Sequence, residues 1–167
     1  MFNKINFLFV TLFGIGKIKK IPGSIASLVT TLFLFFLFHI LNASPNIVLF
    51  GIIIVFLISL YAVNIFIKNL TNKDPKEVVI DEFIGQSIPI CLYEVAHTIL
   101  KDAEDNLKFY LIMFVLFRVF DIAKPFPVNY YDKNFKNSFG VIMDDICAGF
   151  YVVLTLVCFM IIKSYIL

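Results

Sequence analysis

The stretch that most constrains the fold of this chain runs from Lys20 to Lys68, because no charged residue lies between them. It is interrupted once, at 42–46, by the turn-forming sequence Asn-Ala-Ser-Pro-Asn. Two apolar segments result, at about 24–41 and 47–67. The second is long enough, at about 1.5 Å per residue, to cross a hydrocarbon core of about 30 Å. We therefore predict a hairpin of two membrane helices.

The composition agrees with a membrane protein and excludes several other classes. Of the 167 residues, 60% are hydrophobic and the mean hydropathy is +0.94, whereas soluble domains are about 45–50% apolar. The length predicts one domain over 1–167. The net charge of +2 is too small to indicate a nucleic-acid partner. The three cysteines show no metal-type spacing, which indicates buried, reduced thiols.

Three further apolar segments follow, at about 83–99, 109–123 and 146–162, and the first two carry polar residues near an end. The segment Met1–Gly16 predicts a helix at the membrane interface that ends at its glycines. The predicted fold is therefore an all-α integral membrane helical bundle, with about four to five spans plus an N-terminal interfacial helix.

This topology places a polar loop at 125–140 and sorts the basic residues. Lys101, Lys108 and Lys163 alone fall on one face, and all other lysines and the arginine fall on the opposite face. The positive-inside tendency assigns that opposite, basic face to the cytoplasm. The polar clusters of the chain all fall on this same face.

The chain's one arginine, Arg118, begins the first notable polar cluster. Asp121 and Lys124 follow at i+3 and i+6, so that the three side chains share an arc of about 120° on a helix. Pro125 ends that helix. Taken alone, Arg118 and Asp121 are best interpreted as a structural ion pair at a helix end.

Two acidic pairs give the cluster a chemical interpretation. Asp81-Glu82 and Asp144-Asp145 each enter an apolar run, where a charge is costly and usually has a partner. The first pair also suits a helix N-terminus, whose dipole stabilises carboxylates. If the hairpins bring both pairs to one face, four carboxylates form a nest of hard oxygen ligands that suits Mg²⁺.

A glycine- and lysine-rich loop at 14–27 precedes the first long span. Ser24 is positioned to cap the following helix, and the free N–H groups of a helix start bind anions. A plain loop with a positive-inside anchor explains the same residues when they are taken alone. We include Ser24 and Ser27 with Arg118 and Lys124 as candidate phosphate-binding side chains.

Four motifs, in this order, resemble the phosphatidylglycerophosphatase A family: IPGSIASL, VVIDEFIGQ, FRVFDIAKPFP and GVIMDDICAG. They extend over about 14–149. Ser24 stands where the family usually has threonine, and Ala26 where it has a second glycine. The resemblance implies a magnesium-dependent enzyme of phospholipid biosynthesis, multi-pass in the bacterial inner membrane with its active site on the cytoplasmic face. Its implied substrate is phosphatidylglycerophosphate, from which it removes the terminal phosphate.

Carried over position by position, the resemblance implies five metal-binding and catalytic acids: Asp81, Glu82, Asp121, Asp144 and Asp145. It does not assign ligand or base among them. A small membrane cation transporter or cation-binding protein is the competing class, because acids inside a membrane often mark ion paths. Such a protein is expected to place its acids near mid-span, whereas here they lie near span ends. The sequence indicates no particular oligomeric state.

Overall fold

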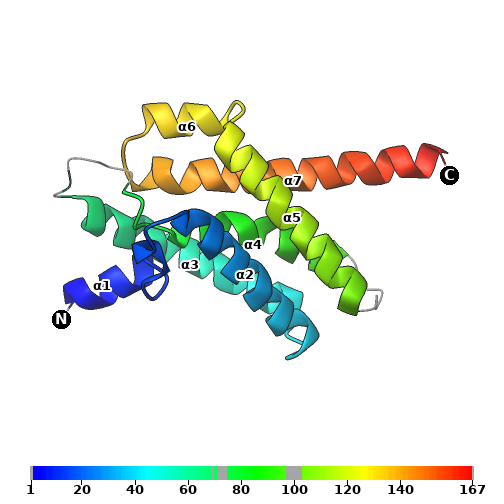
Figure 1. Cartoon of the computed structure of the whole chain (residues 1–167), viewed down its shortest axis with the longest axis horizontal. Helices are drawn as coiled ribbons and strands as arrows, with labels where there is room; N and C mark the ends of the chain where they lie inside the picture. The colour runs from blue at the N-terminus through cyan, green and yellow to red at the C-terminus, as the bar shows by residue number, and fades with distance from the viewer. Residues whose placement is uncertain (1, 69, 71–74, 97–102, 167) are drawn as a thin grey trace.

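The computed structural model describes residues 2–68, 70, 75–96 and 103–166, and these residues form helices and no strands (Figure 1). The all-α prediction is therefore confirmed. In chain order the elements are α1 (Phe2–Val10), the 3-10 helix η1 (Ile15–Lys17), α2 (Pro22–His39), α3 (Pro45–Ile67), α4 (Ile80–Ala96), α5 (Ala103–Ala123), α6 (Val128–Asn134) and α7 (Ser138–Ile166).

Three helices in the described part of the chain are long and apolar enough to cross a membrane: α2, α3 and α7. The first two are the helices predicted from the uncharged stretch; they follow one another in the chain, and each packs against α4 rather than mainly against the other. The segments predicted at 83–99 and 109–123 fall in helices α4 and α5, which are not among these three; residues 97–99 lie outside the described residues. Helix α4 contains only 17 residues and has Pro89 inside it, and α5 begins with the charged sequence Ala-Glu-Asp.

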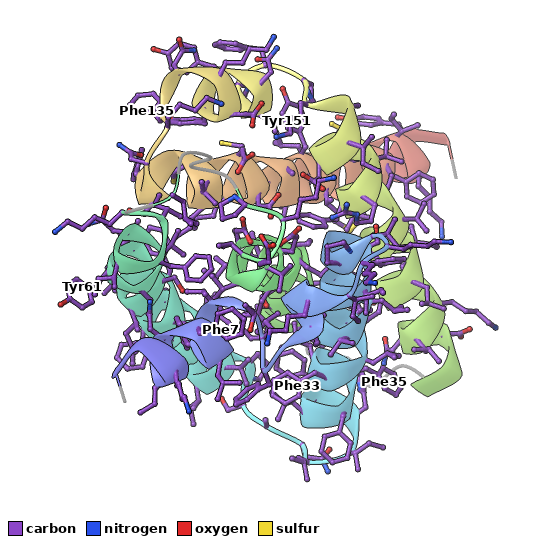
Figure 2. The ribbon with its side chains drawn as sticks, turned by 60° about the vertical axis from the view of Figure 1, so that its left-hand side comes forward. Phe7, Phe33, Phe35, Tyr61, Phe135 and Tyr151 are labelled. Atoms are coloured by element: carbon purple, nitrogen blue, oxygen red, sulfur yellow. The ribbon has the colours of Figure 1, made fainter. Side chains whose placement is uncertain are left out.

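Three predicted boundaries were wrong. The N-terminal helix ends at Val10 rather than at Gly14. The predicted polar loop at 125–140 contains α6, which packs along α7 through Tyr131, Phe135 and Phe139 (Figures 1 and 2). Helix α7 begins at Ser138, well before the predicted span. Its acidic pair therefore lies in the second turn, because burial against α4 supports the helix where sequence polarity suggested a loop.

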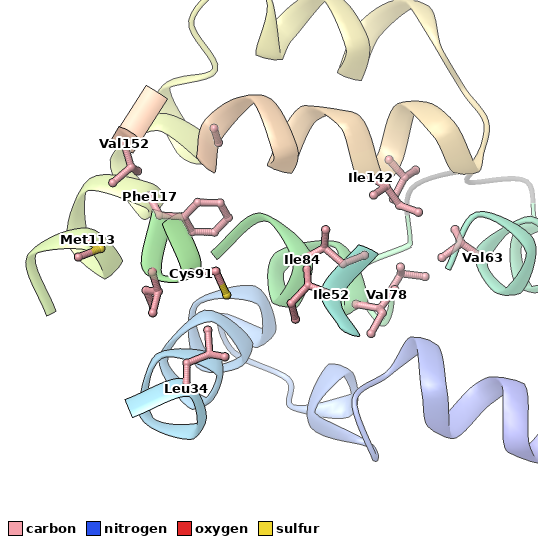
Figure 3. Packing of buried hydrophobic residues seen from close by; sticks show 14 of the residues in the cluster. Leu34, Ile52, Val63, Val78, Ile84, Cys91, Met113, Phe117, Ile142 and Val152 are labelled. Atoms are coloured by element: carbon pink, nitrogen blue, oxygen red, sulfur yellow. The ribbon is translucent and has the colours of Figure 1, made fainter. Parts of the chain in front are cut away.

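Helix α4 lies at the centre and packs against α2, α3 and α7. Figure 3 shows the side chains around it, with Ile84 of α4 near Ile52 of α3 and Ile142 of α7. Its closest neighbour is α7, at Gly85 and Gly149. A Cβ on Gly85 would lie 2.6 Å from the carbonyl oxygen of Asp145, and one on Gly149 would lie 2.4 Å from that of Gly85.

Pro89 explains why this crossing can be so close. A proline has no N–H, so Pro89 cannot donate the helical hydrogen bond to the carbonyl of Gly85, four residues earlier. That carbonyl faces Gly149 of the neighbouring helix. Small residues at such a contact let two helix backbones approach without a layer of side chains between them.

The N-terminal segment fixes the start of α4. The N–H of Val79 donates to the carbonyl of Val10 over 3.0 Å. A Cβ on Gly16 would lie only 2.0 Å from the carbonyl oxygen of Glu77, so this glycine is required for the approach. The segment before α2 and the segment before α4 are thereby held together.

Gly85→Ala tests the close crossing of α4 and α7. The added methyl meets backbone, which cannot rotate away. We therefore expect the free energy of unfolding to fall by about 1–3 kcal/mol, the usual cost of overpacking. Thermal unfolding in detergent measures it. Gly51→Ala is the matched control, since Gly51 lies inside α3 with nothing within 4 Å of the added Cβ. Alanine there should stabilise the helix by about 0.5–1 kcal/mol. Equal effects of the two variants would contradict the close crossing.

Candidate functional site

Four helices meet at one place in the bundle. Helices α2 and α4 begin there, α5 ends there, and α7 passes the site about two turns after its start, so that residues from four separate stretches become neighbours (Figure 1). The N-termini of α2 and α4 bring partial positive charge to this point. Such an arrangement favours carboxylates and bound anions at the site.

Three carboxyl groups form the centre of the site. Asp81, Glu82 and Asp145 each present an oxygen, and these oxygens lie within 4.8 Å of one another. Asp81 and Asp145 are buried and Glu82 is half-buried. One oxygen of Glu82, Oε2, is buried without a hydrogen-bond partner. Carboxylates that are buried this close together repel one another, so the cluster requires bound protons or a cation.

Arg118 stands beside the cluster with part of its guanidinium free. Its Nη1 lies 2.7 Å from Oδ2 of Asp121, a close ion pair whose angle is not that of a hydrogen bond, and its Nε has no hydrogen-bond partner. Asp121 in turn lies against the carboxyl of Asp145. The ion pair that the i, i+3 spacing suggested is therefore present and adjoins the acidic cluster.

The start of α2 completes this side of the site. A Cβ on Gly23 would lie 2.0 Å from Oε1 of Glu82 and 3.4 Å from Nη1 of Arg118, so a side chain there would displace the carboxylate of Glu82. The residue before the helix, Ile21, supplies no capping hydrogen bond, and Pro22 has no N–H. The first free backbone N–H groups of the helix therefore lie beside an arginine and a carboxylate.

Lys124 follows α5 and is held between two acids. Its Nζ lies 2.9 Å from Asp132 of α6 and 3.0 Å from Asp144 of α7. Burial lowers the pKa of Lys124, but the hydrogen bond to Asp132 and the charge of Asp144 outweigh burial and raise the pKa overall. Lys124 is therefore a permanent cation that ties α6 and α7 to the end of α5.

Two serines predicted to bind phosphate have other contacts. Ser24 was predicted to cap α2, and this was wrong: the helix begins two residues earlier, at Pro22, so Ser24 lies within its first turn. Ser27 is buried and its hydroxyl donates to the carbonyl of Gly23 over 2.9 Å. Ala26, the departure from the family pattern, is fully buried.

The structure thus divides the five predicted acids. Asp81, Glu82 and Asp145 share the centre, while Asp121 pairs with Arg118 and Asp144 pairs with Lys124. Sequence reasoning missed three participants: Gly23, Asp132 and Gln86. Gln86 lies one helical turn after Glu82, is fully buried, and has no partner for either amide atom. Gly23 and Gln86 each lie within a quoted motif, whereas Asp132 carried no signal in the sequence.

The three central carboxyls fit a hard divalent cation. Carboxylate oxygens are the ligands that Mg²⁺ prefers, and a small set of them, completed by water and phosphate oxygens, is its usual environment in proteins. The unpartnered Oε2 of Glu82 offers a further lone pair. No His or Cys ligand is needed for this chemistry, and the cluster contains neither.

Fold and site together define a helical protein with membrane-length helices and a buried acidic cluster beside an arginine, the residue set of metal-assisted phosphate chemistry. The chain belongs to the phosphatidylglycerophosphatase A family, whose model matches residues 8–160.

Individual relatives agree with this assignment. Phosphatidylglycerophosphatase A of Haemophilus influenzae is 32% identical over 142 residues, covering 85% of this chain and 80% of that protein. The Escherichia coli K12 protein of the same name is 29% identical over 138 residues, covering 82% of this chain and 73% of that protein. A Bacteroides thetaiotaomicron protein, named provisionally as a phosphatidylinositol-3-phosphatase, is 38% identical over 51% of this chain and 48% of its own length. No solved structure matches the chain significantly.

Asp81→Asn tests the metal-binding capacity of the cluster. Removing one of three charged ligands should weaken Mn²⁺ binding by about tenfold or more, because an amide oxygen carries no net charge to attract the ion. Free Mn²⁺, measured by electron paramagnetic resonance during titration of detergent-solubilised protein, gives the affinity. Asp105→Asn serves as control, since Asp105 is exposed and pairs only locally with Lys108. Unchanged affinity in Asp81→Asn would contradict the assignment.

Proposed function

We propose that this protein hydrolyses the terminal phosphomonoester of phosphatidylglycerophosphate, giving phosphatidylglycerol and inorganic phosphate, with Mg²⁺ as cofactor. The observation that carries the proposal is the position of Arg118 beside both the three-carboxyl cluster and the start of α2. The names of the Haemophilus and Escherichia coli relatives support the substrate. The reaction belongs to phospholipid biosynthesis.

The cation is expected to occupy the space between Asp81, Glu82 and Asp145. When bound, it supplies Lewis-acid polarisation of the phosphoryl group and a water molecule of lowered pKa. The protein's own contribution begins with these carboxylates, which hold that charge at the edge of an apolar bundle. Helices α4 and α7 fix their spacing through the contact of Gly85 with Asp145.

Arg118 and the start of α2 would bind the phosphate group. A guanidinium can contact two phosphate oxygens at once, and its Nε is free to do so. The uncapped N–H groups near Gly23 face the same place. These fixed donors stabilise the charge that grows on the equatorial oxygens as the ester bond breaks.

Asp121 is the carboxylate we assign to proton transfer. It adjoins Asp145 and Arg118 but lies outside the three-carboxyl cluster. In the proposed step, the oxygen of water bonds to phosphorus, a proton of that water passes to Asp121, and the bond from phosphorus to the glycerol oxygen breaks. The released glycerol oxygen takes a proton from solvent.

The proposed location is the bacterial inner membrane, with the site facing the cytoplasm. The excess of Lys and Arg on the face that carries the four motifs supports this orientation. The terminal phosphate then stays in water while the lipid tails stay in the bilayer. A cation transporter is the less favoured alternative, because these acids cluster at helix ends and the family's curated members are named as phosphatases.

Phosphate release from phosphatidylglycerophosphate by the purified protein tests the proposal. We expect turnover with Mg²⁺, none after EDTA, and a loss of at least about 100-fold in Asp145→Asn, since one charged ligand is removed. Asp105→Asn should keep wild-type activity. Phosphatidylinositol 3-phosphate is assayed in parallel because of the Bacteroides relative. The proposal fails if Mg²⁺ gives no phosphate release from phosphatidylglycerophosphate, or if Asp145→Asn equals wild type.

Arg118→Lys separates bidentate phosphate binding from simple charge. Lysine keeps the positive charge but loses the planar pair of donors, so kcat/KM should fall about 10- to 100-fold. In Arg118→Gln, which loses the charge as well, kcat/KM should fall further. Initial rates over a range of substrate concentrations measure both. Full activity in Arg118→Lys would show that the guanidinium geometry is not used.

A further inference from the structure

An apolar groove of about 280 Å³ lies between α4 and α7, beyond the glycine crossing. Its lining includes Pro89, Tyr93 and Ala96 of α4 and Val153, Val157 and Met160 of α7. Almost no polar surface faces it. The groove therefore suits a hydrocarbon chain and no polar ligand.

The groove continues the same helix seam that carries the acids. Helices α4 and α7 run in parallel, because Asp145 meets Gly85 while Gly149, one turn later, meets Gly85 and Ile88. Along this seam the two helices match in constant register: Asp81 with Asp145, Gly85 with Gly149, Pro89 with Val153, Tyr93 with Val157 and Ala96 with Met160. One continuous stripe on each helix thus passes from carboxylate to glycine to apolar lining.

The separation along this stripe fits a lipid whose phosphate lies at the acids. Asp81 and Pro89 are eight residues apart, which is about 12 Å along a helix. In phosphatidylglycerophosphate, a glycerol, a phosphodiester and a second glycerol separate the scissile phosphate from the acyl chains, and together they can cover such a span. Substrate bound at the acids would bring its chains to the mouth of the groove.

We propose that the α4–α7 groove binds one acyl chain of the lipid substrate and holds the phosphate in register with the acidic cluster. This inference rests on the proposed function. A concave seam contacts a chain from two helices, so it removes more apolar surface from its surroundings than a convex helix face does. A second apolar groove, lined by Ile5, Phe9 and Ile58, lies between α1 and α3, which contribute no acid to the site.

Val153→Phe tests the groove by filling it near the end closest to the acidic cluster. We expect kcat/KM for long-chain phosphatidylglycerophosphate to fall at least tenfold, while the deacylated, water-soluble analogue loses far less. Leu154→Phe is the matched control: the neighbouring residue carries the same change on an exposed face of α7, outside the groove. Its kcat/KM for both substrates should stay within twofold of the wild-type value. Equal losses on both substrates, or no loss on the long-chain lipid, would overturn the proposal.

A second measurement does not depend on hydrolysis and so separates this inference from the proposed function. Phosphatidylglycerol with a diazirine in one acyl chain is photolysed with the purified protein, and the labelled peptides are identified by mass spectrometry. Label should concentrate on residues 89–96 and 153–160 and fall severalfold in Val153→Phe but not in Leu154→Phe. Label spread evenly over the exposed faces of α2, α3 and α7 would overturn the groove even if the enzyme is active.

Discussion

The structure depends on the close contact between α4 and α7 at Gly85 and Gly149. With Cβ atoms excluded, the two helix backbones touch, and the residues one turn earlier, Asp81 and Asp145, are forced together. Two carboxylates at this separation repel each other, so the packing of apolar residues around the crossing must oppose their repulsion. A cation between the carboxyls removes that conflict. Fold stability and ion binding are therefore linked at this crossing.

The surrounding charges are distributed so that each has a distinct partner. Lys124 is held by Asp132 and Asp144, which leaves it fixed between helices. Arg118 contacts Asp121 through one nitrogen and keeps Nε unpaired. Both cations are thus paired with acids, but Arg118 keeps a donor without a hydrogen-bond partner. A guanidinium can therefore hold its carboxylate and still offer a donor to an anion.

The sequence predicted the parts of this site that depend on residue type, and failed where the outcome depends on packing. Charge and apolar runs located helices α2 and α3, and the spacing of Arg118 and Asp121 located their ion pair. The two acidic pairs looked equivalent in sequence, but the helix register matches Asp81 with Asp145 and turns Asp144 to Lys124. That register is set by glycine contacts between distant segments. Aromatic packing likewise made α6 helical within an expected loop.

The most direct test of the account is to locate a divalent ion in an experimental structure. Mn²⁺ replaces Mg²⁺ at carboxylate sites and gives an anomalous X-ray signal, so crystals grown with it report the position of the ion. If these three carboxyls hold the ion, a peak is expected about 2.0–2.3 Å from carboxylate oxygens of Asp81, Glu82 and Asp145. A peak elsewhere with these three carboxyls unliganded, or no peak at saturating Mn²⁺, would contradict it.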